Sequence, residues 1–358
     1  MPRPIVATID RSALTANLLR VRRLCKKARI YAVVKADAYG HGLATALEAF
    51  ASADGIALVE IERAIEARER GWRGPILLLE GCFSPLDWQA ASEHRLEVVV
   101  HCEEQLAMLE ATALSRRIGV HVKVNSGMNR LGFPCARVRD VVRQLTVNAA
   151  VSDIVLMTHF ARADEPDGYV EQLRRFREAT AGLPYPCSLA NSAACFDFDR
   201  VGGEFVRPGI MLYGATPFAQ PERSAAALGL RPAMRLTTQV IAIQSIGPGD
   251  AVGYGGTYVA KRAERIAIIA AGYADGYPRH APTGTPVLVG GARARLVGRV
   301  SMDKIAADVT DLPLVTVGSE VELFGPNLPV DEVAQAAGTI GYQLLTAVAA
   351  RVPRRVLG

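Results

Sequence analysis

Between Ile30 and Arg207 the chain alternates short apolar runs with longer amphipathic stretches, and this alternation constrains the fold more than any other feature. Eight runs have the length and residue types of strands; they are Ile30–Lys35, Gly55–Glu60, Pro75–Glu80, Leu96–His101, Gly119–Asn125, Asp153–His159, Cys187–Asn191 and Phe205–Arg207. Helical patterns separate most of them, at Glu62–Arg70, Glu103–Leu114, Ala136–Leu145 and Tyr169–Ala179. Strands alternating with helices indicate parallel βα units, and eight units predict a closed (β/α)8 barrel of the TIM type. A doubly wound sheet is the main alternative, but its glycine-rich dinucleotide fingerprint is missing after the first strand.

From about Arg231 the pattern changes to strands with few helices between them. The expected strands are Thr237–Ile246, Arg265–Ala271, Thr285–Val289, Ala294–Val300, Ile305–Val309 and Glu320–Leu323, followed by helices at Val330–Ala337 and Tyr342–Arg351. We therefore expect a barrel over residues 10–230 and a mainly antiparallel β domain over residues 231–358. A first strand within residues 1–9 is expected to join the β domain, because the barrel begins only with the first helix.

Composition and charge exclude several classes of protein. No apolar run reaches membrane-spanning length, and the N-terminus has no secretory pattern, so we expect a cytoplasmic protein without a membrane partner. The six cysteines are scattered without a CxxC pair, which predicts reduced thiols and no metal site. The net charge of +5 is modest and the basic run Arg20–Arg29 falls on a predicted helix, so we expect no nucleic-acid partner.

The residues suited to chemistry follow the ends of the predicted strands, where a (β/α)8 barrel carries its active site. Lys35 ends the first strand after five apolar residues, and burial there would lower its pKa and favour the nucleophilic amine. Tyr39 lies just beyond it. Lys123 shares a strand face with His121 and Asn125, and a lysine that points inward needs an anionic partner.

Strands six to eight end in further polar residues, and those after strands seven and eight suit a phosphate. The loops after the seventh and eighth strands are the usual phosphate site of such barrels, and Ser192 with the amides near Gly209 and Ile210 fits one. Taken singly, each residue more often has a structural role: His159 as a core histidine, Ser192 as a helix cap and Arg207 as half of an ion pair. Taken together with a lysine that can form a Schiff base, they indicate pyridoxal phosphate.

The run Val33–Gly42 closely resembles the pyridoxal-phosphate attachment motif of bacterial alanine racemases. The resemblance covers essentially the whole chain, and it recurs at Lys123–Phe133, Thr158–Ala161, Arg207–Gly214, Gly253–Tyr258, Gly272–Tyr277, Gly298–Asp303 and Arg351–Arg354. It implies an isomerase that interconverts L-alanine and D-alanine with pyridoxal 5'-phosphate, for peptidoglycan synthesis or alanine catabolism. It also implies a head-to-tail homodimer in which one subunit's barrel and the other's β domain form each active site.

The resemblance implies a role for each candidate residue. The two acid/base groups would be Lys35 and the partner subunit's Tyr254. The residues expected to hold the cofactor are Lys35, Tyr39, His159, Asn191, Ser192, Arg207, Gly209, Ile210 and Tyr342. Arg130 and the backbone of Met302 would bind the substrate carboxylate. Supporting roles fall to Lys123, expected to be carbamylated, to Tyr273, which would narrow the entrance, and to Asp303.

Three positions depart from common family patterns. Asn125 stands where many members have aspartate, Ser301 where many have cysteine, and Ala350 where some carry a tyrosine that gates the entrance. Two other functions stay open: a racemase of broader amino acid specificity, and a non-enzymatic pyridoxal-phosphate-binding barrel. The second half of the chain argues against the latter, because such proteins lack the β domain that carries Tyr254.

Overall fold

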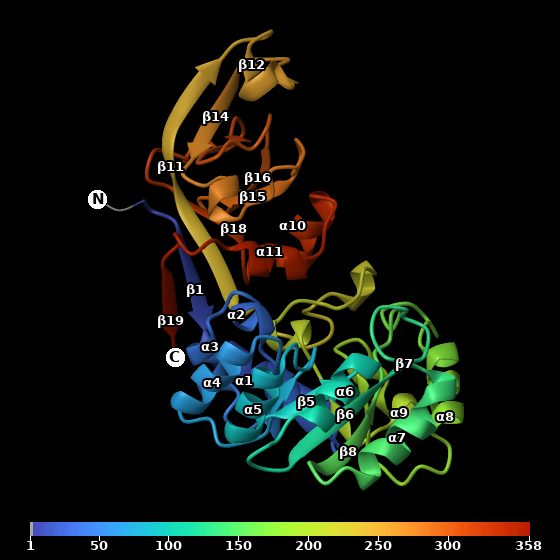
Figure 1. Ribbon diagram of the computed structural model, residues 1–358. Coiled ribbons are helices and arrows are strands. Elements are labelled where there is room, and N and C mark those ends of the chain that lie inside the picture. Colours follow the sequence, from blue (N-terminus) through green and yellow to red (C-terminus); the bar gives the residue numbers. More distant parts are fainter. Residues whose placement is uncertain (1–2) are drawn as a thin grey trace.

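A computed structural model describes residues 3–358 and arranges them in two parts, with a barrel below and a β domain above (Figure 1). The strand expected within residues 1–9 is β1 (Val6–Asp10). The first two residues of that prediction lie outside the described residues. The boundary between residues 230 and 231 stays a prediction.

Eight parallel strands form the barrel. They are β2 (Arg29–Val33), β3 (Gly55–Leu58), β4 (Ile76–Leu78), β5 (Glu97–Val100), β6 (Ile118–Asn125), β8 (Val151–Met157), β9 (Cys187–Ala190) and β10 (Phe205–Val206). Their order is β5-β4-β3-β2-β10-β9-β8-β6, and β5 also pairs with β6, which closes the ring. A two-residue strand, β7 (Phe133–Pro134), extends the sheet beside β6. The (β/α)8 prediction is therefore confirmed.

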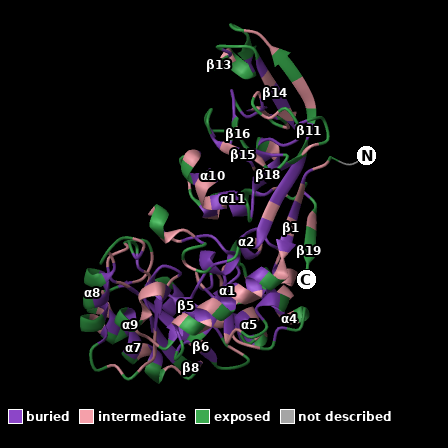
Figure 2. Ribbon diagram, turned by 180° about the vertical axis from the view of Figure 1, so that it is seen from behind, coloured by how far each residue is buried: buried purple, intermediate pink, exposed green. Residues whose placement is uncertain are grey.

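Helices surround this ring and bury one face against it. They are α1 (Arg11–Leu24), α3 (Leu43–Ala49), α4 (Ile61–Glu69), α5 (Pro85–Glu93), α6 (Glu103–Ala111), α7 (Val138–Val147), α8 (Val170–Thr180) and α9 (Phe198–Val201). Helix α1 begins at Arg11 because the Asp10 carboxylate accepts the Ala13 amide at 3.0 Å. Its residues Leu14 and Leu18 are fully buried. Figure 2 shows the same division throughout, with buried strands inside and exposed residues on the outer helices.

The upper part is a mainly antiparallel β domain, as predicted. Its strands are β11 (Met234–Ile246), β12 (Ala251–Val252), β13 (Tyr258–Val259), β14 (Glu264–Ile269), β15 (Pro286–Val289), β16 (Ala292–Leu296), β17 (Ile305–Asp308), β18 (Glu320–Phe324) and β19 (Arg354–Leu357). Six of them, β14-β17-β16-β15-β18-β11, form an antiparallel ring because the long β11 also pairs with β14. Strand β1 pairs with β11 on one side and β19 on the other, so the N-terminal strand joins this domain.

The last part of the β domain differs from the prediction in two elements. The helix expected over Tyr342–Arg351 is α11 (Gly341–Ala347), and the strand β19 that follows it was not predicted. The helix ends early because the Ala349 amide donates to the Asp275 carbonyl at 3.1 Å instead of to a helical carbonyl. The strand is mostly exposed and is specified by its pairing with β1, which residue types alone do not indicate.

The prediction that Lys35 ends a strand was wrong in detail. Strand β2 ends at Val33, and Lys35 begins α2 (Lys35–Tyr39), in which the four residues after the lysine have φ of 51–54°. This left-handed conformation costs roughly 1–2 kcal/mol per non-glycine residue. It is held by the Asp37 carboxylate, which accepts the Leu43 amide at 3.0 Å, and by packing of α11 against α2. The turn leaves Lys35 accessible to solvent at the rim of the barrel.

One buried carboxyl group makes the stability of the fold depend on pH. Asp331 lies in α10 (Val330–Ala336), and desolvation raises its pKa to about 6 although its carboxylate accepts the Thr216 amide at 3.0 Å. The native chain then binds more protons than the unfolded chain, so stability falls as pH rises from about 4 to about 6. We expect Asp331→Asn, which removes the charge and keeps an acceptor, to raise the melting temperature by roughly 2–4 °C at neutral pH. Thermal melts followed by circular dichroism would show the gain shrinking towards pH of about 4, and an equal gain at both pH values would contradict this account.

Candidate active site

Several cationic side chains share the rim of the barrel at the carboxyl ends of its strands. Desolvation lowers the pKa of Lys35, and the positive charge of Arg130 lowers it further. Lys123 is buried in β6, and desolvation followed by repulsion from Arg207 and Arg130 lowers its pKa to about 8. So much positive charge in one place favours an anionic ligand.

His159 lies among the same cations, two residues after the end of β8. Desolvation lowers its pKa well below the ordinary value, and the charges of Arg207 and Lys123 lower it further. Its imidazole is therefore neutral at physiological pH and can both donate and accept a hydrogen bond.

The loops after β9 and β10 meet at the barrel mouth, where the sequence predicts a phosphate site. The Ser192 hydroxyl accepts the amides of Gly209 at 2.8 Å and Met211 at 3.4 Å. A Cβ on Gly209 would lie 2.3 Å from the Tyr39 hydroxyl, so only glycine allows this phenol to come so close to the loop. Backbone amides, a serine hydroxyl and a phenol are thus gathered within one small volume.

Two further residues of the predicted set close this arrangement. Ile210 is fully buried at the start of η3 (Ile210–Tyr213), directly after the loop. The Asn191 side chain accepts the Ala194 amide at 3.1 Å and donates to the Phe160 carbonyl at 3.3 Å. Asn191 therefore holds the loop that leads into the short helix η2 (Ala194–Asp197), while the Ser192 hydroxyl contacts the amides of Gly209 and Met211.

Tyrosines from distant parts of the chain pack around Tyr39. The Tyr39 ring stacks on the Tyr213 ring with the two centroids 4.5 Å apart. The centroid of the Tyr342 ring lies 6.1 Å from that of Tyr39. Tyr342 comes from α11, so the β domain of the same chain covers one side of the barrel mouth. Burial raises the pKa of all three phenols, which are therefore neutral donors.

Arg207 is buried, and its guanidinium is held by three contacts that the sequence did not reveal, the longest of them to the Leu189 carbonyl at 3.5 Å. The two shorter contacts are to the Ser188 hydroxyl at 2.5 Å and to the Thr158 carbonyl at 2.6 Å, both of which accept from the guanidinium. Desolvation lowers its pKa to about 10, so it is still protonated at neutral pH. Ser188 lies on β9 and Thr158 directly after β8, so strand register rather than a motif brings them to Arg207. A guanidinium has five N–H donors, more than these contacts use.

His121 faces the opposite opening of the barrel from Lys123. Its ring is 3.0 Å from the Glu97 carboxylate, to which the Tyr31 hydroxyl also donates. These side chains line a cavity of about 480 Å³ at the amino ends of the strands. The residues predicted on one face of β6 are therefore divided between the two ends of the barrel.

The remaining candidates are carried by the β domain and are open to solvent. Tyr254 is 72% exposed and begins η5 (Tyr254–Gly256), next to β12, which Figure 1 places at the end of the β domain farthest from the barrel. Met302 is 53% exposed and Tyr273 37% exposed. Asp303 instead pairs with Arg351 at 2.6 Å. One chain alone does not bring Tyr254 to Lys35.

Residues 3–358 contain neither a candidate metal site nor a candidate membrane-spanning helix. No group of three or more His, Cys, Asp or Glu side chains is arranged to hold a metal ion. No helix of this part of the chain is long and apolar enough to cross a membrane.

Comparison with known proteins gives consistent matches over both parts of the chain. The family model described as "Alanine racemase, N-terminal domain" matches residues 9–217, and "Alanine racemase, C-terminal domain" matches residues 233–356. An alanine racemase of Janthinobacterium sp. (strain Marseille) is 52% identical over 98% of each chain. A catabolic alanine racemase of Salmonella typhimurium is 50% identical over 99% of each chain. The crystal structure of a biosynthetic alanine racemase from Pseudomonas aeruginosa superposes with a TM-score of 0.97 at 46% identity, covering 99% of this chain and 100% of that one.

The barrel with a lysine at its mouth, the closed β domain that follows it and the matches to racemases along the whole length make the protein a two-part isomerase of the barrel type. Within that class, the family models, relatives and solved structure named above all point to one family. The chain belongs to the alanine racemase family, as its motifs predicted.

Proposed function

We propose that the protein interconverts L-alanine and D-alanine as a pyridoxal-phosphate-dependent homodimer. One observation carries this proposal: Lys35, accessible and with a lowered pKa, shares the barrel mouth with the Ser192 and Gly209 phosphate loop. An amine available to an aldehyde and a separate site for a phosphate match the two ends of this cofactor.

The residues at the barrel mouth offer a partner for each end of the cofactor. Lys35 would bond to it, and Arg207 would face its ring nitrogen. The groups that would hold its phosphate and surround it are Tyr39, His159, Asn191, Ser192, Gly209, Ile210 and Tyr342. Only a glycine at position 209 lets the Tyr39 hydroxyl come this close to the loop, which places a phenol donor beside the backbone amides and supports a phosphate there.

Pyridoxal phosphate, when bound, supplies an electron sink that acidifies the α-proton of an amino acid. Racemisation takes that proton from one face and returns a proton to the other. The Lys35 amine and the phenol of the partner subunit's Tyr254 would serve the two faces, which needs little motion of the substrate. Neutral His159 is suited to accept a hydrogen bond from that phenol, because its lowered pKa leaves a ring nitrogen free of a proton.

Arg207 would weaken the cofactor ring as an electron sink instead of strengthening it. Its pKa of about 10 keeps the guanidinium protonated at neutral pH, so it does not pass a proton to the ring nitrogen. A pyridine ring that stays unprotonated is a weaker electron sink, which disfavours a long-lived carbanion and side reactions such as transamination. Many related enzymes place a carboxylate at this position, which has the opposite effect.

Binding of the substrate carboxylate is assigned to Arg130 and to the backbone of Met302 from the partner. We propose a head-to-tail dimer because Tyr254 and Met302 are both largely exposed in one chain and Tyr254 lies far from the mouth. Tyr273 would narrow the entrance, and Asp303 would support it.

Racemisation of a panel of L-amino acids by the purified, cofactor-supplied protein tests the function. We expect L-alanine to be converted about 100-fold more efficiently than larger residues, as read by chiral chromatography. Comparable rates for several large residues would favour the broad-specificity alternative. A visible cofactor spectrum without any racemisation would favour the non-enzymatic one. Deleting the gene would separate the two biological roles, because a biosynthetic enzyme makes growth independent of added D-alanine.

Lys123 is expected to carry a carbamate. A pKa of about 8 leaves part of its amine neutral, and carbon dioxide can then bond to the nitrogen with loss of one proton. The anion formed would lie among Arg207, Arg130 and Lys35, whose charges favour it. Carbon-13 NMR with labelled bicarbonate should show one bound signal that Lys123→Gln removes and the surface change Lys26→Ala does not. An unmodified ammonium with chloride beside it would refute this assignment.

A further inference from the structure

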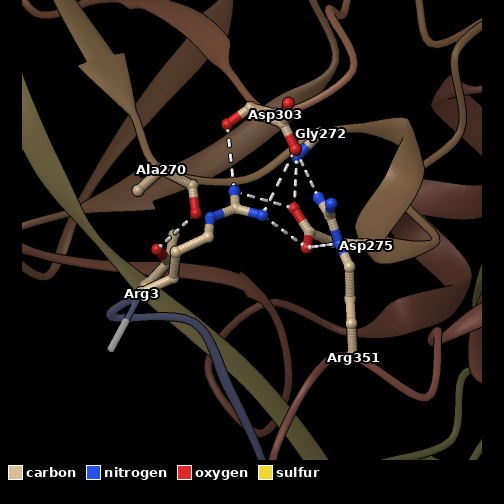
Figure 3. A network of polar contacts seen from close by, with 7 residues as sticks. Arg3, Ala270, Gly272, Asp275, Asp303 and Arg351 are labelled. Carbon is tan, nitrogen blue, oxygen red and sulfur yellow. Dashed lines mark hydrogen bonds and ion pairs between the residues drawn. The ribbon is translucent and has the colours of Figure 1, made fainter. Parts of the chain in front are cut away.

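Four charged side chains meet beneath the predicted entrance residues of the β domain. Figure 3 shows the guanidinium groups of Arg3 and Arg351 converging on the carboxylate of Asp275. Arg3 donates to both of its oxygens, at 3.0 and 3.1 Å, and Arg351 donates to one at 2.8 Å. Asp303 completes this cluster, the entrance quartet, by accepting from Arg351 at 2.6 Å.

The quartet joins three segments that are distant in sequence. Arg3 precedes β1, Asp275 ends η6 (Tyr273–Asp275), and Arg351 lies in the turn before β19. Asp275 is the buried member, with a side chain only 1% exposed, while both arginines keep about 40% of their side chains exposed. A buried carboxylate that loses a cationic partner is costly, so each arginine constrains the position of Asp275.

The same cluster fixes the two loops that carry Tyr273 and Met302. The second oxygen of Asp275 accepts the Gly272 amide at 2.9 Å, next to Tyr273. The Tyr273 amide donates to the Ser301 carbonyl at 3.1 Å, and the Ala274 amide donates to the Met302 carbonyl at 3.0 Å.

The backbones of these two loops are in close contact. A Cβ at Gly272 would lie 2.3 Å from the carbonyl oxygens of both Ser301 and Met302. The Asp303 carbonyl accepts from Arg3 at 3.1 Å, which holds the far end of the second loop. A shift of Asp275 would therefore move both loops together.

We propose that Asp275 is a positioning residue for the substrate entrance. With Arg3 and Arg351 it sets the place of Tyr273 and of the Met302 backbone, and through them the size of amino acid that reaches the partner subunit's barrel. This inference rests on the proposed function, which assigns the entrance to Tyr273 and the substrate carboxylate to Met302.

The test is Asp275→Asn in the full-length, cofactor-supplied protein. The amide offers one acceptor oxygen and an NH2 group to arginine and glycine donors, so some contacts become donor against donor. We expect KM for L-alanine to rise about 5- to 20-fold with kcat changed less than about threefold. The kcat/KM ratio of L-alanine to the larger L-serine should fall about tenfold.

Arg351→Gln gives a second variant at the more exposed side of the quartet, and it should change KM and the ratio in the same direction. Glu332→Gln is the control, because it breaks an exposed ion pair with Arg293 in the same domain and should match the wild type. Sedimentation, melting temperature and the visible spectrum establish that each variant is folded, dimeric and loaded.

Each outcome has one consequence. Folded Asp275→Asn or Arg351→Gln with wild-type KM and substrate ratio would overturn the inference, and a lowered melting temperature alone would assign the quartet a structural role only. If Asp275→Asn does not fold, Arg351→Gln decides the question. A wild-type protein that racemises no alanine would overturn the proposed function, which is a different result from variants that equal an active wild type.

Discussion

Lys35→Ala is expected to lower racemisation of alanine by at least about 10⁴-fold in both directions, because one residue would both bond the cofactor and move a proton. It should also remove the visible absorbance that pyridoxal phosphate gives the wild-type protein. We expect Lys35→Ala to fold normally, because the Lys35 side chain is solvent-accessible at the barrel rim and does not pack in the core. A loss of activity would then not come from unfolding.

The measurements are the rate from each enantiomer and the visible spectrum after dialysis against the cofactor. Lys26→Ala provides a matched control, because it removes an exposed lysine in the turn after α1. The control should keep the spectrum and both rates. Turnover retained in both directions by Lys35→Ala would remove this lysine from the site.

The barrel could be predicted from sequence because its strands are mostly buried and consist largely of apolar residues. The turn at Lys35 could not, since Ala36 and Ala38 have no local preference for positive φ and adopt it only under tertiary contacts. The same holds for Ser188, which meets Arg207 only through the register of β9 and β10.

The candidate site shows a similar division. Residues that follow strand ends, such as Ser192 and His159, could be placed because fold class fixes where those ends meet. The place of Tyr254 could be expected only from the family motif. Its own chain leaves it exposed at the far end of the β domain, and a single sequence does not encode a second subunit's position.

Tyr254→Phe should slow net racemisation by at least about 10³-fold and affect the two enantiomers differently. The phenol is expected to take the α-proton of L-alanine, so exchange of that proton should be lost. Lys35 should still exchange the α-proton of D-alanine. Proton NMR in D₂O measures both exchanges separately, and equal loss from both enantiomers would contradict two bases on opposite faces.

The dimer can be tested by combining the two inactive variants. If each site joins Lys35 of one barrel to the partner subunit's Tyr254, a mixed dimer of Lys35→Ala and Tyr254→Phe chains contains one site with both residues intact and one site with neither. Random reassortment makes about half of the dimers mixed, so roughly a quarter of the wild-type activity should return after the variants are unfolded and refolded together. If Tyr254 acted within its own chain, no combination of these variants would hold both residues in one site. Activity that stays at the level of the separate variants, in a sample shown by mass to contain mixed dimers, would therefore reject the shared site.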